Sequence, residues 1–273
     1  MKYVIGIDIG GSMTKICAFN EAGDLIEPMS VRATDPLASF YGAFGKFTQK
    51  NNITLSEVSR LRITGVGSSF VDEAPFGLPV EIVSEFSAVG CGGLYLSGLD
   101  DALVVSMGTG TAMVRAKGEN YRYLGGTGIG GGTLKGLSKE ILNMDDLSHV
   151  RDLAADGDLA NIDLRISDIT SKNIIPTLPA DSTAANFGKL SDLATPADKA
   201  YGIMNLVFES IGMMAVFAAR GEGVENIVLT GRLSEESAAA EIFRKLSGML
   251  RVNFIIPPRS RYGTVVGAAL CKE

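Results

Sequence analysis

The sequence contains no tryptophan and a single histidine, His149. That histidine lies in the polar, helix-like stretch D-D-L-S-H-V-R-D-L, where a surface position is a simpler interpretation than a catalytic one. A zinc site built from histidines and a Ser-His-Asp triad are therefore both disfavoured. If the chain is an enzyme that needs a general base, we expect a carboxylate.

Cysteines and basic residues are also few. Cys17, Cys91 and Cys271 are scattered and lack the spacing of a zinc site or of a disulfide framework. With 25 lysines and arginines against 31 acidic residues, the net charge of -6 argues against nucleic acid or an anionic membrane as a partner. A small anionic ligand stays compatible with this charge, because glycine loops and a few cations can bind phosphate inside an acidic protein.

Membrane and secretion signals are missing as well. We find no apolar stretch as long as a membrane span, and the start Met-Lys-Tyr-Val leads into a strand pattern without the layout of a signal peptide. We therefore expect a soluble, cytoplasmic protein with reduced thiols.

The sequence does provide enough apolar residues for a large core. It has 273 residues, of which 46% are hydrophobic and 21% charged, which fits one large domain or two lobes that share a cleft. The stretches V-I-G-I-D-I-G-G-S-M-T-K and L-V-V-S-M-G-T-G-T-A-M-V begin about one hundred residues apart, and both run from an apolar strand through a glycine corner into an alternating strand. This internal echo favours two similar lobes with facing glycine corners, although ordinary hairpins share the pattern.

The elements expected along the chain alternate between strands and helices. We predict strands at 2–9, 12–19, 24–32, 60–64, 80–83, 102–107, 112–116, 121–124, 226–230 and 252–256. We predict helices at 37–49, 85–96, 198–219, 235–250 and 263–271, with helices dominating from about 133 to 220.

The first glycine corner joins two strands and so differs from the Rossmann and P-loop motifs, in which a helix follows the glycines. Gly10, Gly11 and Ser12 would let backbone N–H groups approach a phosphate, with Lys15 as a point charge on the phosphate tail. Asp8, at the end of a buried strand, would need a cation, and Mg²⁺ bound directly or through water would supply it. A plain hairpin with an exposed Asp and a surface Lys explains the motif equally well.

Three further glycine loops follow. The second contains Ser106, Gly108, Thr109, Gly110 and Thr111, the third contains Gly130, Gly131 and Gly132 before a helix that starts near Thr133, and the fourth contains Gly231 after a strand. A helix N-terminus and the carboxyl ends of strands are both places where phosphate-bearing ligands bind. Four such loops in one chain favour a nucleotide.

These motifs resemble those of the actin, Hsp70 and sugar-kinase ATPase superfamily, and within it of the type II pantothenate kinases in their compact bacterial form. The matching segments are G-I-D-I-G-G at 6–11, E-F-S-A at 85–88, G-T-G-T at 108–111, G-G-T-G-I-G-G-G at 125–132 and D-S-T-A-A-N-F-G at 181–188. The last is the most specific. The resemblance implies an α/β, two-lobed actin-like ATPase (ribonuclease H-like) fold with the nucleotide in the interlobe cleft. The lobes would be residues 1–100 and 101–273, with the last helix able to return to the first lobe.

The resemblance also implies a reaction, namely ATP-dependent phosphorylation of pantothenate to 4'-phosphopantothenate, the first committed step of coenzyme A biosynthesis. ATP and Mg²⁺ would be the cofactors, Asp8 would position Mg-ATP, and Glu85 would be the general base. The alternative for Glu85 is a purely structural role, in which Ser84 caps the helix and the negative charge of Glu85 is favourable at the helix N-terminus. Family members are homodimers through a long helix that corresponds to 198–219 here, although this apolar stretch would also fit a helix buried within one lobe.

The resemblance also implies which residues bind the substrate, namely Ser106, Thr109, Arg122, Tyr123 and Gly125. The family has an arginine, which binds the pantothenate carboxylate, at the place of Tyr123, whereas here the arginine is one residue earlier. A one-residue shift on a strand reverses the direction of a side chain. A second departure is Ser87, where relatives often have an aspartate.

Three alternatives remain at this stage. An N-acetylhexosamine kinase of the same superfamily should lack T-A-A-N-F-G. An ATPase that activates a dehydratase by electron transfer would need cysteines that bridge an iron–sulfur cluster, which the scattered cysteines do not suggest. A non-catalytic nucleotide sensor would bind ATP without turnover.

Overall fold

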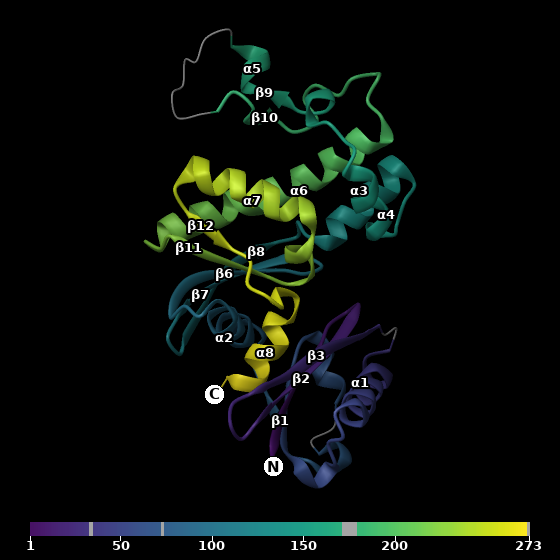
Figure 1. The fold of residues 1–273 in the computed structure, drawn as a ribbon, viewed down its shortest axis with the longest axis vertical. Coiled ribbons are helices and arrows are strands. Elements are labelled where there is room, and N and C mark those ends of the chain that lie inside the picture. The colour runs from purple at the N-terminus through teal and green to yellow at the C-terminus, as the bar shows by residue number, and fades with distance from the viewer. Residues whose placement is uncertain (33–34, 72–73, 171–178, 272–273) are drawn as a thin grey trace.

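The computed structural model describes residues 1–32, 35–71, 74–170 and 179–271 and has an α/β fold built on two mixed five-stranded sheets (Figure 1). The first sheet consists of β3 (Leu25–Arg32), β2 (Met13–Asn20), β1 (Tyr3–Ile9), β4 (Val58–Thr64) and β5 (Val80–Ile82), in this spatial order. The second consists of β12 (Asn253–Ile255), β11 (Asn226–Thr230), β6 (Asp101–Met107), β7 (Thr111–Lys117) and β8 (Asn120–Thr127). The expected fold class is confirmed.

The two sheets have the same topology. In the first, β1, β2 and β3 form an antiparallel meander, while β4 and β5 add to the other edge of β1 in parallel. In the second, β6, β7 and β8 form the meander and β11 and β12 add in parallel. The internal echo in the sequence therefore corresponds to equivalent hairpins, β1–β2 and β6–β7.

Helices cover these sheets. The α-helices are α1 (Pro36–Lys50), α2 (Glu85–Ser97), α3 (Gly131–Leu142), α4 (Leu147–Ala154), α5 (Ile166–Ile169), α6 (Pro196–Gly221), α7 (Ser237–Leu250) and α8 (Gly263–Leu270). Short 3₁₀ helices are η1 (Leu55–Glu57), η2 (Val66–Phe70), η3 (Pro75–Gly77), η4 (Leu159–Asn161), η5 (Arg232–Glu235) and η6 (Ser260–Tyr262). Figure 1 shows α6 and α7 on one side of the second sheet, α1 beside the first sheet, and α2 with α8 between the sheets.

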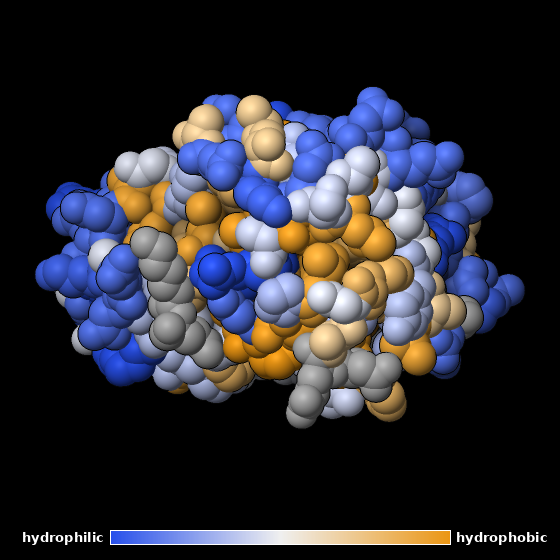
Figure 2. All heavy atoms as spheres, turned by 90° about the horizontal axis from the view of Figure 1, so that it is seen from below, coloured by the Kyte–Doolittle hydropathy of each residue, from blue (hydrophilic) through white to orange (hydrophobic). Residues whose placement is uncertain are grey.

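The hydrophobic core has two main parts. One lies between the second sheet and the helices α3, α4, α6 and α7, and the other lies between the first sheet and α1. The last helix, α8, packs directly on β1, because Gly6 leaves no side chain in the way and a Cβ there would lie 2.6 Å from the carbonyl oxygen of Val265. The end of the molecule formed by the first sheet has hydrophobic side chains in the middle of its surface and hydrophilic ones at the flanks (Figure 2).

The long helix α6 corrects one sequence expectation. By length and composition alone, Pro196–Gly221 could cross a membrane, so an apolar stretch of that length does exist. Its sequence starts the helix firmly, since Thr195 and Asp198 form a capping box and Pro196 occupies the first turn. Much of the helix is buried, including Phe208 and Ile211, which are fully buried in the core cluster of the second sheet. The apolar length thus serves packing inside the protein.

Most predicted elements match the structure within a few residues. The main omission is the two-stranded sheet of β9 (Leu164–Arg165) and β10 (Thr183–Ala185), inside the region predicted as mainly helical. Strands of two or three residues are too short to show a period. Part of that prediction, residues 171–178, falls outside the described residues.

Candidate active site

Both sheets contribute to one large cleft of about 1170 Å³, which exceeds the usual volume of a pocket for a single small ligand, up to roughly 1,000 Å³. The predicted site residues that line it are Asp8, Gly10, Gly11, Ser12, Lys15, Glu85, Ser106, Gly108, Thr109, Gly110, Thr111, Tyr123, Gly131, Gly132 and Gly231. Three predicted residues, Arg122, Gly125 and Gly130, are not part of its lining. The cleft has room for a nucleotide and a second substrate together.

The first glycine corner presents a carboxylate and an ammonium group to the cleft. Asp8 and Lys15 are direct partners across the β1–β2 hairpin, and Lys15 Nζ lies 3.3 Å from Asp8 Oδ2. Asp8 is only 7% exposed, so the lysine provides the cation that a buried carboxylate requires. In the described part of the chain, the N–H groups of Gly11 and Ser12 make no backbone hydrogen bond, which leaves them available to an anion.

The second and third glycine loops support each other. The N–H groups of Gly131 and Gly132 donate to the carbonyl oxygens of Gly108 and Thr109, at 2.9 and 2.8 Å. A Cβ on Gly130 would lie 2.6 Å from the Thr109 carbonyl oxygen. These glycines therefore allow the two loops to pack closely, and their N–H groups are already used within the protein.

The fourth loop requires its glycine for two reasons. Gly231 has a φ of 88°, and a Cβ there would lie 2.5 Å from the carbonyl oxygen of Met107. Glycine adopts this left-handed conformation without steric cost. The tight turn brings Arg232, at the start of η5, into the cleft lining.

Glu85 is the first residue of α2 and opens onto the same cleft as Asp8. Solvent reaches the side chain through the cleft, yet the surrounding walls desolvate the carboxyl group. Desolvation raises the pKa of Glu85, the charge of Asp8 raises it further, and the charge of Lys15 opposes the shift. Ser84 occupies the N-cap position without a side-chain capping hydrogen bond. Glu85 lies in the first turn of α2, where a negative charge is favourable, so this part of the helix N-terminus interpretation fits the structure.

The neighbouring residues Arg122 and Tyr123 face opposite sides of the second sheet. Arg122 Nη2 lies 2.5 Å from Glu222 Oε2, beside the end of α6, and so does not reach the cleft. Tyr123 lines the cleft and stacks on Phe86 of α2. The alternation of side chains along β8 explains this split.

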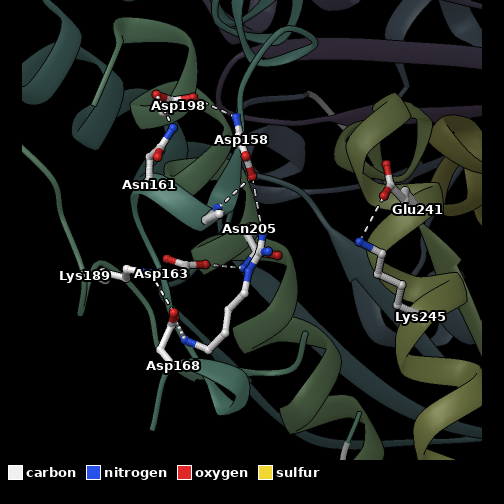
Figure 3. A network of polar contacts seen from close by, with 11 residues as sticks. Asp158, Asn161, Asp163, Asp168, Lys189, Asp198, Asn205, Glu241 and Lys245 are labelled. Atoms are coloured by element: carbon white, nitrogen blue, oxygen red, sulfur yellow. Dashed lines mark hydrogen bonds and ion pairs between the residues drawn. The ribbon is translucent and has the colours of Figure 1, made fainter. Parts of the chain in front are cut away.

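A polar network holds the most specific sequence motif, 181–188, against α6. Asp163 accepts a hydrogen bond from Asn205 Nδ2 at 2.8 Å (Figure 3). It also accepts one from the Phe187 N–H at 2.8 Å. Asn186 donates to Glu209, whose pKa is raised by burial. Phe187 has a φ of 56°, which is uncommon for a residue other than glycine. The motif is therefore fixed by Asp163 and by Glu209 of α6.

Several cleft residues were not predicted from the sequence. The most important carry charge: Arg32, Lys135, Arg232, Arg261, Asp145 and Asp146. Arg232 directly follows Gly231 and Lys135 is three residues beyond Gly132, so their positions could have been inferred. Gly65 also lines the cleft, and a Cβ on it would lie 2.8 Å from Asp8 Oδ1. Gly65 could have been recognised from the sequence, because it directly follows the strand predicted at 60–64.

Comparisons with known proteins agree with this geometry. The Fumble family model matches residues 101–247. The type II pantothenate kinase of Staphylococcus aureus (strain USA300) is 30% identical over 236 residues, which cover 83% of each chain, and the protein of strain NCTC 8325 matches equally.

Solved structures with the same fold include two dehydratase components and a sugar kinase. Component A of the (R)-2-hydroxyglutaryl-CoA dehydratase from Acidaminococcus fermentans has a TM-score of 0.72 at 17% identity and covers 99% of this chain and 97% of its own. The activator of the 2-hydroxyisocaproyl-CoA dehydratase from Clostridium difficile, with bound ADPNP, has a TM-score of 0.69 at 16% identity, covering 98% and 93%. A ROK family glucokinase from Streptomyces griseus, in complex with glucose and AMPPNP, has a TM-score of 0.64 at 15% identity, covering 98% of each chain. At these identities the likeness concerns the fold alone.

Proposed function

The chain belongs to the Fumble family of type II pantothenate kinases, and from this premise we propose that it transfers the γ-phosphoryl group of ATP to the primary hydroxyl of pantothenate. The product, 4'-phosphopantothenate, makes this the first committed step of coenzyme A biosynthesis. The observation that carries the proposal is that Asp8, Glu85 and the glycine corners of both sheets open onto one cleft.

Gly10, Gly11, Ser12 and the second glycine loop, Gly108 to Thr111, hold the phosphates in this proposal. The available N–H groups of Gly11 and Ser12 support that role. Gly130, Gly131, Gly132 and Gly231 act by allowing close approach of the backbone, and Lys15 neutralises phosphate charge. Lys135 and Arg232 add positive charge to the same cleft. Phosphoryl transfer depends mainly on such positioning and charge neutralisation.

The residues present fit Mg²⁺ as a companion of ATP. No group of three or more metal-ligating side chains occurs among the described residues, so a dedicated protein cage is not the arrangement here. Mg²⁺ is usually held by one or two carboxylates together with substrate phosphates and water. Asp8, at 7% exposure, is the carboxylate suited to this role, directly or through water. When bound, the ion would neutralise charge on the phosphates.

Glu85 acts as the general base. Its carboxylate accepts the proton of the pantothenate hydroxyl while the hydroxyl oxygen attacks the γ-phosphorus and ADP leaves. The raised pKa of Glu85 supports the role, because a carboxylate with a pKa closer to neutrality is a better proton acceptor. In this proposal Ser106, Thr109 and Tyr123, which line the cleft, contact the acceptor. The ion pair of Arg122 with Glu222 argues against a contact between Arg122 and the substrate.

The test is phosphate transfer from Mg-ATP to pantothenate and, in parallel, to N-acetylhexosamines. We expect transfer to pantothenate, and a Glu85→Gln variant should lose ~10²–10⁴-fold in kcat. Glu140→Gln, on an exposed position of α3, is the matched control and should keep full activity. Transfer only to hexosamines would indicate the sugar-kinase alternative. ATP binding without any transfer would indicate a nucleotide sensor.

We further infer that the protein works as a cytoplasmic homodimer, with residues 1–100 and 101–273 as its two lobes. The exposed side of α6 supports the dimer, since Phe217 on this otherwise largely buried helix is 62% exposed. An exposed aromatic side chain on a long helix is a suitable contact for a second copy.

A further inference from the structure

Thr64 carries a buried hydroxyl group that forms no hydrogen bond. It is the last residue of β4 and is only 1% exposed, and its Oγ1 atom has no hydrogen-bond partner among the residues that the structure describes. Leaving a buried polar group without a partner destabilises a fold, and native proteins contain few such groups. The hydroxyl of Thr64 therefore calls for a role other than stability.

Thr64 lies directly beside Asp8 on the same face of the first sheet. The two residues are partners in the parallel pair of β1 and β4, and the pair two residues earlier is Gly6 with Arg62. Arg62 Nη1 donates to the carbonyl oxygen of Ala269 in α8, and a Cβ on Gly6 would lie 2.7 Å from the Ala269 side chain. Side chains two residues apart on a strand point to the same side, so Asp8 and Thr64 both point towards α8. Neighbouring strands lie ~4.8 Å apart, which places the hydroxyl within reach of the carboxylate.

The present partner of Asp8 is held loosely and has a second task. Lys15 Nζ lies 3.3 Å from Asp8 Oδ2, which is longer than the ~2.7–2.9 Å of a strong charge-assisted hydrogen bond. In the proposed function Lys15 neutralises phosphate charge, so it moves away from Asp8 when a nucleotide is bound. Asp8 is only 7% exposed, and a buried carboxylate that loses its cation needs another donor. Carboxylates that hold a metal ion are usually fixed by a hydrogen bond from a neighbouring group.

We propose that Thr64 is a positioning residue for Asp8, and that its hydroxyl donates a hydrogen bond to the Asp8 carboxylate when Lys15 turns to the nucleotide phosphates. This inference rests on the proposed function. A rotation about the Cα–Cβ bond of Thr64 is enough to redirect Oγ1, and the backbone of β4 stays in place. The bond holds one carboxylate oxygen, and the other stays available to the Mg²⁺ that accompanies ATP.

The first experiment separates activity from stability. Thr64→Val keeps the shape of the side chain and removes the hydroxyl. Its kcat for pantothenate should fall by ~10-fold or more, and the Mg²⁺ concentration for half-maximal activity should rise. The urea midpoint of the ligand-free variant should equal or exceed that of the parent, because a methyl group replaces a hydroxyl without a partner. Thr64→Ser should show the opposite pattern: it keeps the hydroxyl and most of the activity, but it leaves a small cavity and lowers the urea midpoint.

Thr230 provides the matched control in the second sheet. It ends β11 as Thr64 ends β4, is fully buried, and is the register partner of Ser106 on β6. Its hydroxyl already donates to the carbonyl oxygen of Val105, at 3.4 Å. Thr230→Val should therefore lower the urea midpoint and leave the Mg²⁺ dependence unchanged.

Nucleotide binding and a double substitution supply the second line of evidence. Calorimetric titration with a non-hydrolysable ATP analogue, with and without Mg²⁺, measures how much the ion tightens binding. Thr64→Val should lose most of the Mg²⁺-dependent gain in affinity that the parent shows. In an Asp8→Asn background, Thr64→Val should change kcat by less than ~2-fold, because the hydroxyl acts through the carboxylate.

Three results would overturn the inference while leaving the kinase assignment intact. They are a Thr64→Val variant with the kcat and Mg²⁺ dependence of the parent, a Thr64→Ser variant that loses as much activity as Thr64→Val, and equal losses from Thr64→Val in both backgrounds. A Thr64→Val variant that unfolds more easily than the parent would show a structural role instead. A parent that transfers no phosphate to pantothenate would overturn the proposed function, and the calorimetric comparison would then decide the role of Thr64.

Discussion

Gly92 of α2 and Gly263 of α8 touch backbone to backbone: a Cβ on Gly92 would overlap the carbonyl oxygen of Gly263. Gly267 makes the reciprocal contact, because a Cβ there would overlap the carbonyl oxygen of Ala88. This close crossing connects the helix that begins with Glu85 to the helix that packs on β1, the strand of Asp8. The relative position of the two carboxylates therefore depends on glycines outside the cleft.

The close crossing of α2 and α8 predicts that a single methyl group added at Gly92 strongly lowers the stability of the fold. Gly92→Ala should lower the free energy of unfolding by about 3 kcal/mol or more, because backbone atoms cannot move aside as a side chain can. Urea unfolding measures this difference. Gly42→Ala, on an exposed position of α1 with open space around it, is the control and should be neutral or stabilising by up to about 1 kcal/mol. Equal effects of the two substitutions would contradict the close crossing.

If Asp8 helps to hold Mg²⁺, its replacement should change how the kinase activity depends on the Mg²⁺ concentration. Asp8→Asn should lower kcat by ~10²–10³-fold, since it removes a fixed charge at the place where phosphate charge is held. It should also raise the Mg²⁺ concentration needed for half-maximal activity. Initial rates over a Mg²⁺ titration check both effects, with Asp24→Asn, at an exposed turn, as the control. An unchanged Mg²⁺ dependence would argue against metal binding by Asp8.

The electrostatics of Glu85 predict the pH dependence. As the base must be deprotonated, kcat/KM should fall as the pH is lowered through the pKa of Glu85, which desolvation and the charge of Asp8 hold above its usual value. Lys15 opposes this shift, so Lys15→Met should move the acidic limb of the profile to higher pH and also weaken ATP binding. Lys139→Met, on the exposed side of α3, should not move it. A shift to lower pH in Lys15→Met would refute this assignment of charges.

The polar network around motif 181–188 predicts that loss of the Asn205 side chain lowers the stability of the protein. Asn205→Ala removes the donor to Asp163 and one donor to Glu209, and leaves Asp163, at 1% exposure, with fewer partners. We expect a loss of about 1–3 kcal/mol in the free energy of unfolding. Asn253→Ala, at an exposed position, should cost far less. Thermal and urea unfolding of the two variants provide the comparison.

The exposed side of α6 predicts the oligomeric state. The parent should have the mass of a dimer in light scattering after size-exclusion chromatography, and Phe217→Glu should shift it towards the monomer. Leu55→Glu replaces a hydrophobic residue of similar exposure, 48%, on the first lobe and should leave the mass unchanged. A parent that is monomeric at all concentrations would rule out the proposed dimer.

Much of the fold could be predicted from local patterns. Apolar runs and glycine corners were enough to locate β1, β2, β6 and β7 and to suggest that the two hairpins are equivalent. The apolar sequence was enough to predict α6 as 198–219, and the capping box of Thr195 and Asp198, which is also a local property, sets its true start at Pro196. The strands β9 and β10 could not be predicted, because two or three residues are too few to show a period.

The sequence by itself was enough to identify the glycine corners, the carboxylates Asp8 and Glu85, and Tyr123 at the place where the family has an arginine. Only the tertiary structure decided that these residues share one cleft, that Arg122 turns to Glu222, and that the N–H groups of Gly131 and Gly132 serve the neighbouring loop. The physical reason is that local sequence sets backbone preferences and side-chain alternation. Which groups meet, and which donors remain free for a ligand, depends on contacts between segments that are separated in the chain, as in the Gly131–Gly108 hydrogen bond and the Arg122–Glu222 pair.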